Sequence, residues 1–287
     1  MNNTCTLCPN LCKIDKSTQK GLCGTGDKIY VAKYYLHPYE EPAISGDNGS
    51  GTVFFCGCSL QCVFCQNYEL SRSMRGKQIS INELVDVFKL LEDSGAHNIN
   101  LVSPTHYSDK IIKALKIYRP KIPIVYNTHG YENISVLQDL NEYVDVYLPD
   151  IKFLSPSASK RYCGKENYFE VASRAIEFMI NSKPLVFEDN GLIKSGVIVR
   201  HLVLPQNTND SKKILDWFYN FKDKAFINVM SQYTPFGKID SYPELQRKIT
   251  KREYESVIDY ALSLGIEKMF YQEQLSADEK YIPKWDF

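Results

Sequence analysis

Three cysteines, Cys58, Cys62 and Cys65, have the spacing C-x3-C-x2-C within the stretch CGCSLQCVFCQN. Three thiolates on one tight loop can bind three irons of a cubic [4Fe–4S] cluster, whereas the usual four cysteines leave no iron open. An iron without a protein ligand is able to bind a small molecule. Zinc normally takes four protein ligands, or three and a water. We therefore expect an iron–sulfur cluster, with structural zinc or plain thiols as the alternative. Cys56 lies outside the motif and is expected in a strand.

Four further cysteines precede this loop. Cys5, Cys8, Cys12 and Cys23 have the spacing C-x2-C-x3-C-x10-C. Four thiolates can tie down a segment that is too short to fold alone. Zinc would make a closed structural site, and iron with sulfide would make an auxiliary cluster that carries an electron. We expect a metal here, and both metals stay open, with four free thiols as the remaining alternative.

Strand-like and helix-like segments alternate after residue 50. Short apolar segments that predict strands cover residues 51–56, 98–103, 122–128, 144–152, 196–205, 225–233 and 267–272. Segments with helical periodicity lie between them, at residues 80–95, 107–118, 133–143, 166–182, 210–221 and 252–265. Such alternation predicts a parallel sheet with helical crossovers, either barrel-like or doubly wound. In both architectures the chemistry lies at the carboxyl ends of the strands.

The chain divides into three parts on this interpretation. Residues 1–26 form a cysteine-rich metal-binding segment, residues 27–50 a connecting strand and linker, and residues 51–287 the alternating domain. Two capping boxes are predicted at helix starts, Ser80 with Glu83 and Thr250 with Glu253.

The composition limits the classes of function. The chain has 287 residues, with 34 Lys and Arg against 34 Asp and Glu, so no global charge attracts nucleic acid or an anionic membrane. No apolar run reaches the roughly 20 residues of a membrane helix, and the N-terminus lacks the apolar core of a signal peptide. We expect a cytoplasmic protein with reduced thiols. Nine cysteines, an odd number, fit poorly with a disulfide framework. Cys163 is isolated and is interpreted as a thiol without a role.

The three-cysteine loop resembles that of the radical S-adenosylmethionine (SAM) enzymes. The resemblance implies a partial (β/α)6 barrel of the TIM-like type, with the amino and carboxylate groups of SAM on the open iron. It also implies that the reduced cluster cleaves SAM to methionine and a 5′-deoxyadenosyl radical, which abstracts a hydrogen from a substrate. Phe64 matches the family's apolar or aromatic residue beside the adenine.

Further elements resemble the pyruvate formate-lyase activating enzymes, which use SAM to place a radical on a glycine of a partner protein. These elements are LPDIKF, NTHGY, VIVRHLVLP and QYTPFGK, together with Asn67 after the cysteine loop. The similarity extends from about residue 50 to residue 272. It implies a flavodoxin or ferredoxin as the electron donor and a glycyl-radical protein as the substrate.

The resemblance also assigns cofactor-binding candidates. Arg200 is placed to pair with the carboxylate of SAM, with a salt bridge to a helix as the alternative. Asp150 and Lys152 alternate on one strand and face the same side, to position SAM or substrate or to form an internal ion pair. The remaining candidates are hydroxyl and amide side chains near strand ends: Ser103, Thr105, Asn127, Thr128 and Gln232. Asn127 and Thr128 are placed to hydrogen-bond SAM or to coordinate a cation, with a simple turn cap as the alternative.

Two features depart from these families. Radical SAM proteins often carry Gly-Gly-Glu after the second strand to bind the amino group of SAM, and NINLVSPTHY stands there in this chain. No carboxylate is present in that stretch, so the amino contact stays unassigned. Thr234 replaces a histidine of the activating enzyme. His106 and His129 follow predicted strands, where surface positions are the more common interpretation.

The sequence thus predicts a radical SAM enzyme that installs a glycyl radical on a partner protein. One alternative is a radical SAM enzyme that acts on a small molecule or another macromolecule. A second is a non-catalytic zinc or iron–sulfur protein that carries electrons or binds partners. Neither a membrane nor nucleic acid is an expected partner.

Overall fold

The computed structural model describes residues 4–271 and contains one twisted sheet with seven parallel strands. In spatial order the parallel strands are β2 (Ser50–Phe55), β4 (Ile99–Val102), β5 (Ile124–Thr128), β6 (Val146–Pro149), β8 (Ile193–Leu202), β9 (Phe226–Met230) and β10 (Met269–Tyr271). Three antiparallel strands complete it: β1 (Ile29–His37) beside β2, β3 (Lys77–Ile79) beside β1, and β7 (Val186–Phe187) beside β8. All seven predicted strands are present.

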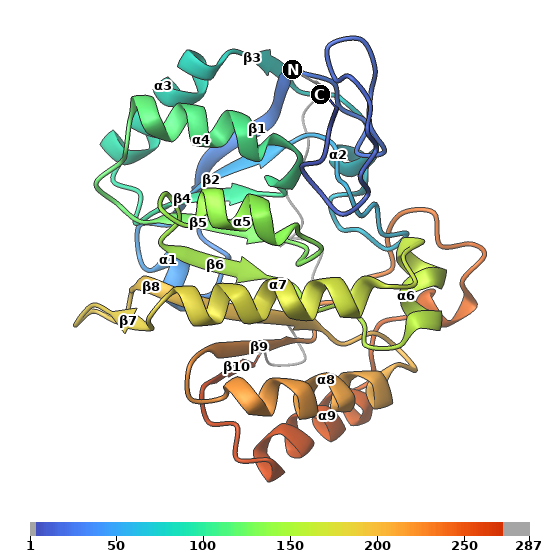
Figure 1. The fold of residues 1–287 in the computed structure, drawn as a ribbon. Helices are drawn as coiled ribbons and strands as arrows, with labels where there is room; N and C mark the ends of the chain where they lie inside the picture. Colours follow the sequence, from blue (N-terminus) through green and yellow to red (C-terminus); the bar gives the residue numbers. More distant parts are fainter. Residues whose placement is uncertain (1–3, 272–287) are drawn as a thin grey trace.

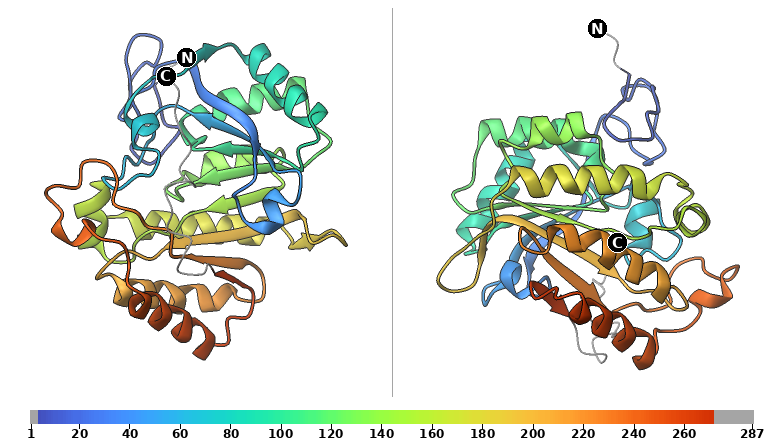
Figure 2. Two further views of the ribbon diagram at one scale, coloured as in Figure 1. Left: turned by 180° about the vertical axis from the view of Figure 1, so that it is seen from behind. Right: turned by 60° about the horizontal axis from the view of Figure 1, so that its bottom comes forward.

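The long helices cover one face of this sheet (Figure 1). They are α3 (Ile81–Asp93), α4 (Ser108–Ile117), α5 (Ile134–Leu140), α7 (Tyr168–Ser182), α8 (Thr208–Phe218) and α9 (Lys251–Ser263). Seen from behind, the sheet lies in front of these helices (Figure 2, left). A doubly wound fold has helices on both faces, so the partial barrel is the correct alternative. Within residues 4–271 the end strands β10 and β3 do not pair, and the sheet is not closed.

Short elements fill the connections. They are α1 (Pro42–Ser45), α2 (Tyr68–Arg72), α6 (Pro156–Cys163) and three 3-10 turns, η1 (Thr105–Tyr107), η2 (Tyr219–Phe221) and η3 (Pro243–Leu245). Helix α6 was not predicted, although Ser155 caps it by accepting from Ala158 N. Parts of three predicted regions lie outside the described residues: residues 1–3 of the 1–26 segment, the end of the 51–287 domain and the last residue of the 267–272 strand.

Local signals in the sequence account for two helix starts. Ser80 with Glu83 and Thr250 with Glu253 both form reciprocal capping boxes at α3 and α9. These bonds satisfy amide groups that have no partner within the helix. Both predicted capping boxes are therefore confirmed.

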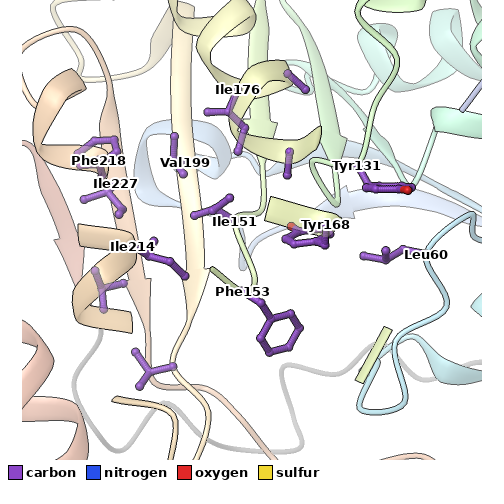
Figure 3. Packing of buried hydrophobic residues seen from close by; sticks show 14 of the residues in the cluster. Leu60, Tyr131, Ile151, Phe153, Tyr168, Ile176, Val199, Ile214, Phe218 and Ile227 are labelled. Carbon is purple, nitrogen blue, oxygen red and sulfur yellow. The ribbon is translucent and has the colours of Figure 1, made fainter. Parts of the chain in front are cut away.

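The main hydrophobic core lies between the sheet and helices α7, α8 and α9. Ile176 of α7 and Ile214 and Phe218 of α8 pack toward Val199 and Ile227 on the strands (Figure 3). The same core continues to the carboxyl edge of the sheet through the labelled side chains Ile151, Phe153, Tyr168, Tyr131 and Leu60. Since Leu60 belongs to the cysteine loop, the core supports that loop directly.

Residues 27–50 are more than a linker in this fold. They form β1, which pairs with β2 from Val31–Phe55 to His37–Ser50, and then α1. Residues 4–26 contain no helix or strand, only an isolated bridge between Thr4 and Asp15. In the described part of the chain, no helix has the length and apolar character needed to cross a membrane.

Gly130 is constrained by the turn after β5. Its φ is +78°, and a Cβ on this residue would collide with the carbonyl oxygen of Asp150. Gly95 provides a matched control, because its φ is +82° and nothing lies within 4 Å of a Cβ there. We expect G95A to lower the free energy of unfolding by about 1–2 kcal/mol, the cost of a left-handed alanine. G130A adds a backbone clash and is expected to cost about 3 kcal/mol or more.

Urea denaturation of the two apo-proteins measures this difference. Equal losses of stability in G95A and G130A would contradict the proposed close contact with Asp150.

Candidate active site

The three motif cysteines lie on the loop between β2 and α2, at the carboxyl edge of the parallel strands. Cys58, Cys62 and Cys65 all line one cavity, and the first two are buried. The loop is anchored across the fold, because Val63 N donates to Tyr162 O over 2.9 Å. The predicted position of the motif is therefore confirmed, and its three thiols share one cavity.

A charged network occupies the same cavity. Arg200 on β8 donates through Nε to Asp150 over 2.9 Å, through Nη1 to Glu40 over 3.2 Å and through Nη2 to Asn127 over 2.5 Å. Lys152 Nζ donates to the second oxygen of Asp150 over 2.6 Å. Arg200 thus pairs with Asp150 and Glu40, which follow strands of the sheet, and not with a residue of a helix. Its contact with the carboxylate of SAM stays a prediction.

Electrostatics stabilises the ionised forms in this network. Burial alone would raise the pKa of Asp150, but Lys152 and Arg200 beside it hold that pKa below its usual range. Burial likewise opposes the charge on Lys152, and Asp150 more than offsets that effect, so the pKa of Lys152 is raised. We infer that Asp150, Lys152 and Arg200 are all charged at neutral pH.

Glu40 was missed by the sequence analysis. It follows β1 and lies in the cavity, where its Oε1 accepts from Asn100 Nδ2 over 3.0 Å and from Asn127 Nδ2 over 3.3 Å. Burial raises its pKa, and Arg200 opposes that rise. No motif marks this residue, because it reaches the site only through the antiparallel pairing of β1 with β2.

Most of the other predicted candidates also line the cavity. Those brought together with the cysteines and the charged network are Phe64, Asn67, Ser103, Asn127, Thr128 and Gln232. Ser103 has a φ of 57°, a conformation rare outside glycine, and its amide donates to Asn127 O over 3.0 Å. Thr105 is fully buried and is not among the lining residues. Phe64 packs edge-to-face against Phe153 and Tyr233, at ring distances of 5.9 Å and 6.3 Å, in an apolar wall.

The family model of the radical SAM superfamily matches residues 52–218, which include β2, the cysteine loop, Asp150 and Arg200. The chain belongs to the radical SAM superfamily. A protein of Methanocaldococcus jannaschii without an assigned function is 31% identical over 276 residues, covering 93% of this chain and 76% of that protein. The pyruvate formate-lyase-activating enzyme of Clostridium pasteurianum is 26% identical over 259 residues, covering 86% of this chain and 96% of that enzyme.

Solved structures support the radical SAM fold. SuiB of Streptococcus suis bound to S-adenosylmethionine has a TM-score of 0.52 at 14% identity, over 75% of this chain and 47% of SuiB. SuiB bound to the precursor peptide SuiA gives a TM-score of 0.53 at the same identity. The chain spans about half the length of these two structures, and the likeness supports the partial barrel alone.

The donor set fits the cluster of a radical SAM protein. Burial raises the pKa of Cys58 to about 12 and that of Cys65 to about 11, so both are neutral thiols without a metal. Iron binding replaces those protons, since the thiolate is the ligand. Among residues 4–271, no three His, Cys, Asp or Glu side chains converge on a position for one ion. A cubane holds its ligands apart, on different irons, and three thiols facing one cavity suit it.

A buried carboxyl group lies beside this radical SAM site. Oε1 of Glu132 accepts from Thr105 over 2.5 Å and from Thr128, while Oε2 has no partner in the described residues. His129 lies nearby and bonds Ser59 Oγ over 2.7 Å. Glu132 carried no signal in the sequence beyond its place after NTHGY.

The histidines that follow strands are buried, so the surface interpretation was wrong. Burial lowers the pKa of His106 to about 4 and that of His129 to about 3. Both are therefore neutral at physiological pH, and they serve as hydrogen-bonding groups within the fold.

Cys163 also differs from its interpretation as an isolated thiol. It ends α6, is buried, and its Sγ lies 3.2 Å from Sγ of Cys62. The two residues are 101 positions apart in the chain, so no local pattern indicates the contact. Cys163 is thus a direct neighbour of a cysteine of the three-cysteine motif.

We expect these two thiols to form a disulfide when the apo-protein is oxidised with diamide. The sulfurs are close, and a bond of about 2.0 Å requires only a small movement. Each thiol loses its proton, the disulfide forms, and diamide takes up two electrons and two protons. Peptide mass mapping identifies the bond, and reconstitution with iron is expected to fall until a reductant restores it.

C163S removes this reaction, whereas C56A keeps it, since Cys56 is also buried but lies outside the pair. Recovery of the same disulfide-free peptides from oxidised wild type and oxidised C163S would contradict the contact.

Glu132 predicts a pH-dependent stability. Burial raises its pKa to about 7 in the folded protein, whereas an unfolded glutamate titrates near 4.3. Between these values the folded state holds the proton and the unfolded state does not, so stability falls as pH rises from about 4.5 to 7 and is level above that. E132Q cannot ionise and is expected to gain about 1–3 kcal/mol relative to wild type between pH 5 and pH 8.

Chemical denaturation at both pH values checks this difference. An unchanged gap between wild type and E132Q across the range would show that Glu132 does not titrate there. E166Q, at an exposed residue, is the matched control.

Proposed function

We propose that this radical SAM enzyme installs a glycyl radical on a partner protein. The observation that carries the proposal is the meeting of Asp150 and Lys152 of LPDIK with Arg200 of VIVRHLVLP in the cavity of the cysteine loop. These are two of the elements that carry the resemblance to the activating enzymes. The Clostridium pasteurianum enzyme, similar over 86% of this chain, adds support.

The cavity has separate regions for the parts of SAM. The thiols of Cys58, Cys62 and Cys65 would hold the cluster, and bound cluster would supply the electron and the open iron for SAM. Phe64 offers an apolar wall for the adenine. Asn127, together with the Asp150–Lys152 pair, would fix polar groups of SAM or substrate.

The reaction balances with one external electron. A flavodoxin or ferredoxin supplies it, the bond between sulfur and C5′ of SAM breaks, and methionine leaves. The 5′-carbon then takes a hydrogen atom from Cα of a glycine, which gives 5′-deoxyadenosine and the glycyl radical. The protein's part is to keep water out and to hold the glycine against the 5′-carbon.

The first test is anaerobic. The protein is reconstituted with iron and sulfide, reduced with dithionite and mixed with SAM, and 5′-deoxyadenosine is measured with the EPR spectrum. We expect 5′-deoxyadenosine from wild type and none from C62A, and a reduced-cluster signal that SAM changes. No SAM-dependent change in wild type would contradict the proposed SAM cleavage.

The substrate class is tested with pyruvate formate-lyase labelled with α-deuterated glycine. Transfer of deuterium into 5′-deoxyadenosine and a glycyl EPR signal are expected. D150N leaves Arg200 and Lys152 without their shared carboxylate, and the transfer should fall roughly 10- to 100-fold, while E166Q should match wild type. Formation of 5′-deoxyadenosine without deuterium would exclude this glycyl-radical substrate and keep the radical SAM chemistry.

A further inference from the structure

The four N-terminal cysteines lie in one short segment, where two are buried and two are partly buried. Cys8 and Cys23 are each 6% exposed. A Cβ on Gly21 would lie 3.4 Å from Sγ of Cys23 and 3.5 Å from Sγ of Cys12, so these two thiols flank one glycine. The backbone of Cys5 pairs with residues 13 and 14, next to Cys12, over 3.1 Å and 2.8 Å.

Cys8 belongs to the same short segment. It is buried, and its carbonyl oxygen accepts from Leu11 N over 3.0 Å, next to Cys12. All nine cysteines of the chain are free, and no disulfide holds the segment together. The thiols are therefore gathered without a covalent bond between them.

In this segment the cysteines are more buried than two of the leucines. Cys8 and Cys23 are buried, whereas Leu11 and Leu22 are 48% and 61% exposed. Residues 4–26 contain no helix or strand that would hold such a chain in shape. A short segment without an apolar core normally needs a metal or disulfides to fold. Since none of its cysteines forms a disulfide, the four thiols favour a metal as the group that holds this segment together.

The spacing of the thiols favours a polynuclear group over one zinc ion. Zinc draws four sulfurs to about 2.3 Å from one point, and no three such ligands in residues 4–271 converge in that way. The same is true of the three cysteines on the radical SAM loop, which suit a cubane. Two sulfurs also have hydrogen-bonding neighbours of the kind that tune iron–sulfur potentials: Leu22 N donates to Cys12 Sγ over 3.5 Å, and Thr25 Oγ1 lies 3.1 Å from Cys23 Sγ.

The segment docks directly on the radical SAM loop. Cys58 N donates to Cys23 O over 3.2 Å, so a ligand of one site touches a ligand of the other through the backbone. Gly57 permits this approach, because a Cβ there would lie 2.6 Å from Cys23 O. Two side chains add to the contact: Gln61 Nε2 donates to Leu22 O and Asn10 Nδ2 donates to Ser59 O, both over 2.7 Å.

We propose that Cys5, Cys8, Cys12 and Cys23 bind an iron–sulfur cluster that passes one electron to the radical SAM cluster. An external one-electron reductant such as flavodoxin reduces the N-terminal cluster. That cluster is oxidised again when the electron moves to the second cluster, so it undergoes no net change. The inference rests on the radical SAM chemistry of the proposed function and is independent of the substrate.

Metal content tests the site. The triple variant C58A/C62A/C65A keeps only the N-terminal cysteines as a ligand set. After anaerobic reconstitution it is expected to retain iron and sulfide in equal amounts, about two to four of each per chain, with a reduced EPR signal that SAM does not change. One equivalent of zinc without iron, or no metal at all, would overturn the proposal.

The relay is tested in the full chain. C12S/C23S should lose that iron and keep the SAM-dependent EPR change of the radical SAM cluster, which also shows that the variant is folded. With reduced flavodoxin its 5′-deoxyadenosine formation should fall at least tenfold, whereas dithionite, a small reductant, should restore most of it. C56A, which removes a buried cysteine outside both sets, should match wild type.

Two results would distinguish a failure of the electron relay from a failure of the proposed function. Full flavodoxin-driven activity in C12S/C23S would refute the relay. Absence of 5′-deoxyadenosine from wild type with dithionite would instead refute the proposed function. If C12S/C23S does not fold, Cys12→Ser alone is measured in the same way, since Cys12 is the more exposed of that pair.

Discussion

The guanidinium of Arg200 connects four strands or strand ends of this fold. It joins Asp150 after β6, Asn127 on β5 and Glu40 after β1, and it lies itself on β8. Removing one partner of a buried ion pair is strongly destabilising, because it leaves a charge without compensation. The network therefore adds side-chain contacts to the backbone pairing that already joins these strands. The cysteine loop follows β2, so its position depends on the position of that strand in the sheet.

The sequence could predict the features that depend on residues close together in the chain. The three cysteines are close in the chain, so their meeting on one loop required no knowledge of the fold. The capping boxes at Ser80 and Thr250 are equally local. The order of the parallel strands followed from alternation, and the common edge for Asp150 and Arg200 followed from that order. These features depend on short stretches of sequence or on the regular alternation of strands and helices.

What the sequence could not predict depends on contacts between distant elements. Glu40 enters the cavity because β1 folds back on β2, and an antiparallel strand before the alternating region has no signature of that role. Cys163 meets Cys62 because α6 ends against the cysteine loop. Thr105, a predicted SAM-binding candidate, is fully buried, and its hydroxyl donates to Glu132 over 2.5 Å, a contact that no motif indicates. In each case a tertiary contact, and no local propensity, fixes the outcome.

The charged network lies at the same edge of the sheet as the stretch NINLVSPTHY, which contains no carboxylate. Arg200 pairs with Asp150 and Glu40, and Lys152 pairs with Asp150, so each cation of the network lies against a carboxyl group. Among the residues that line the cavity, the carboxyl groups therefore come from Glu40 after β1 and Asp150 after β6, and not from the turn after β4. A buried charge needs a partner of opposite sign, and this network meets that requirement without an acidic residue after β4.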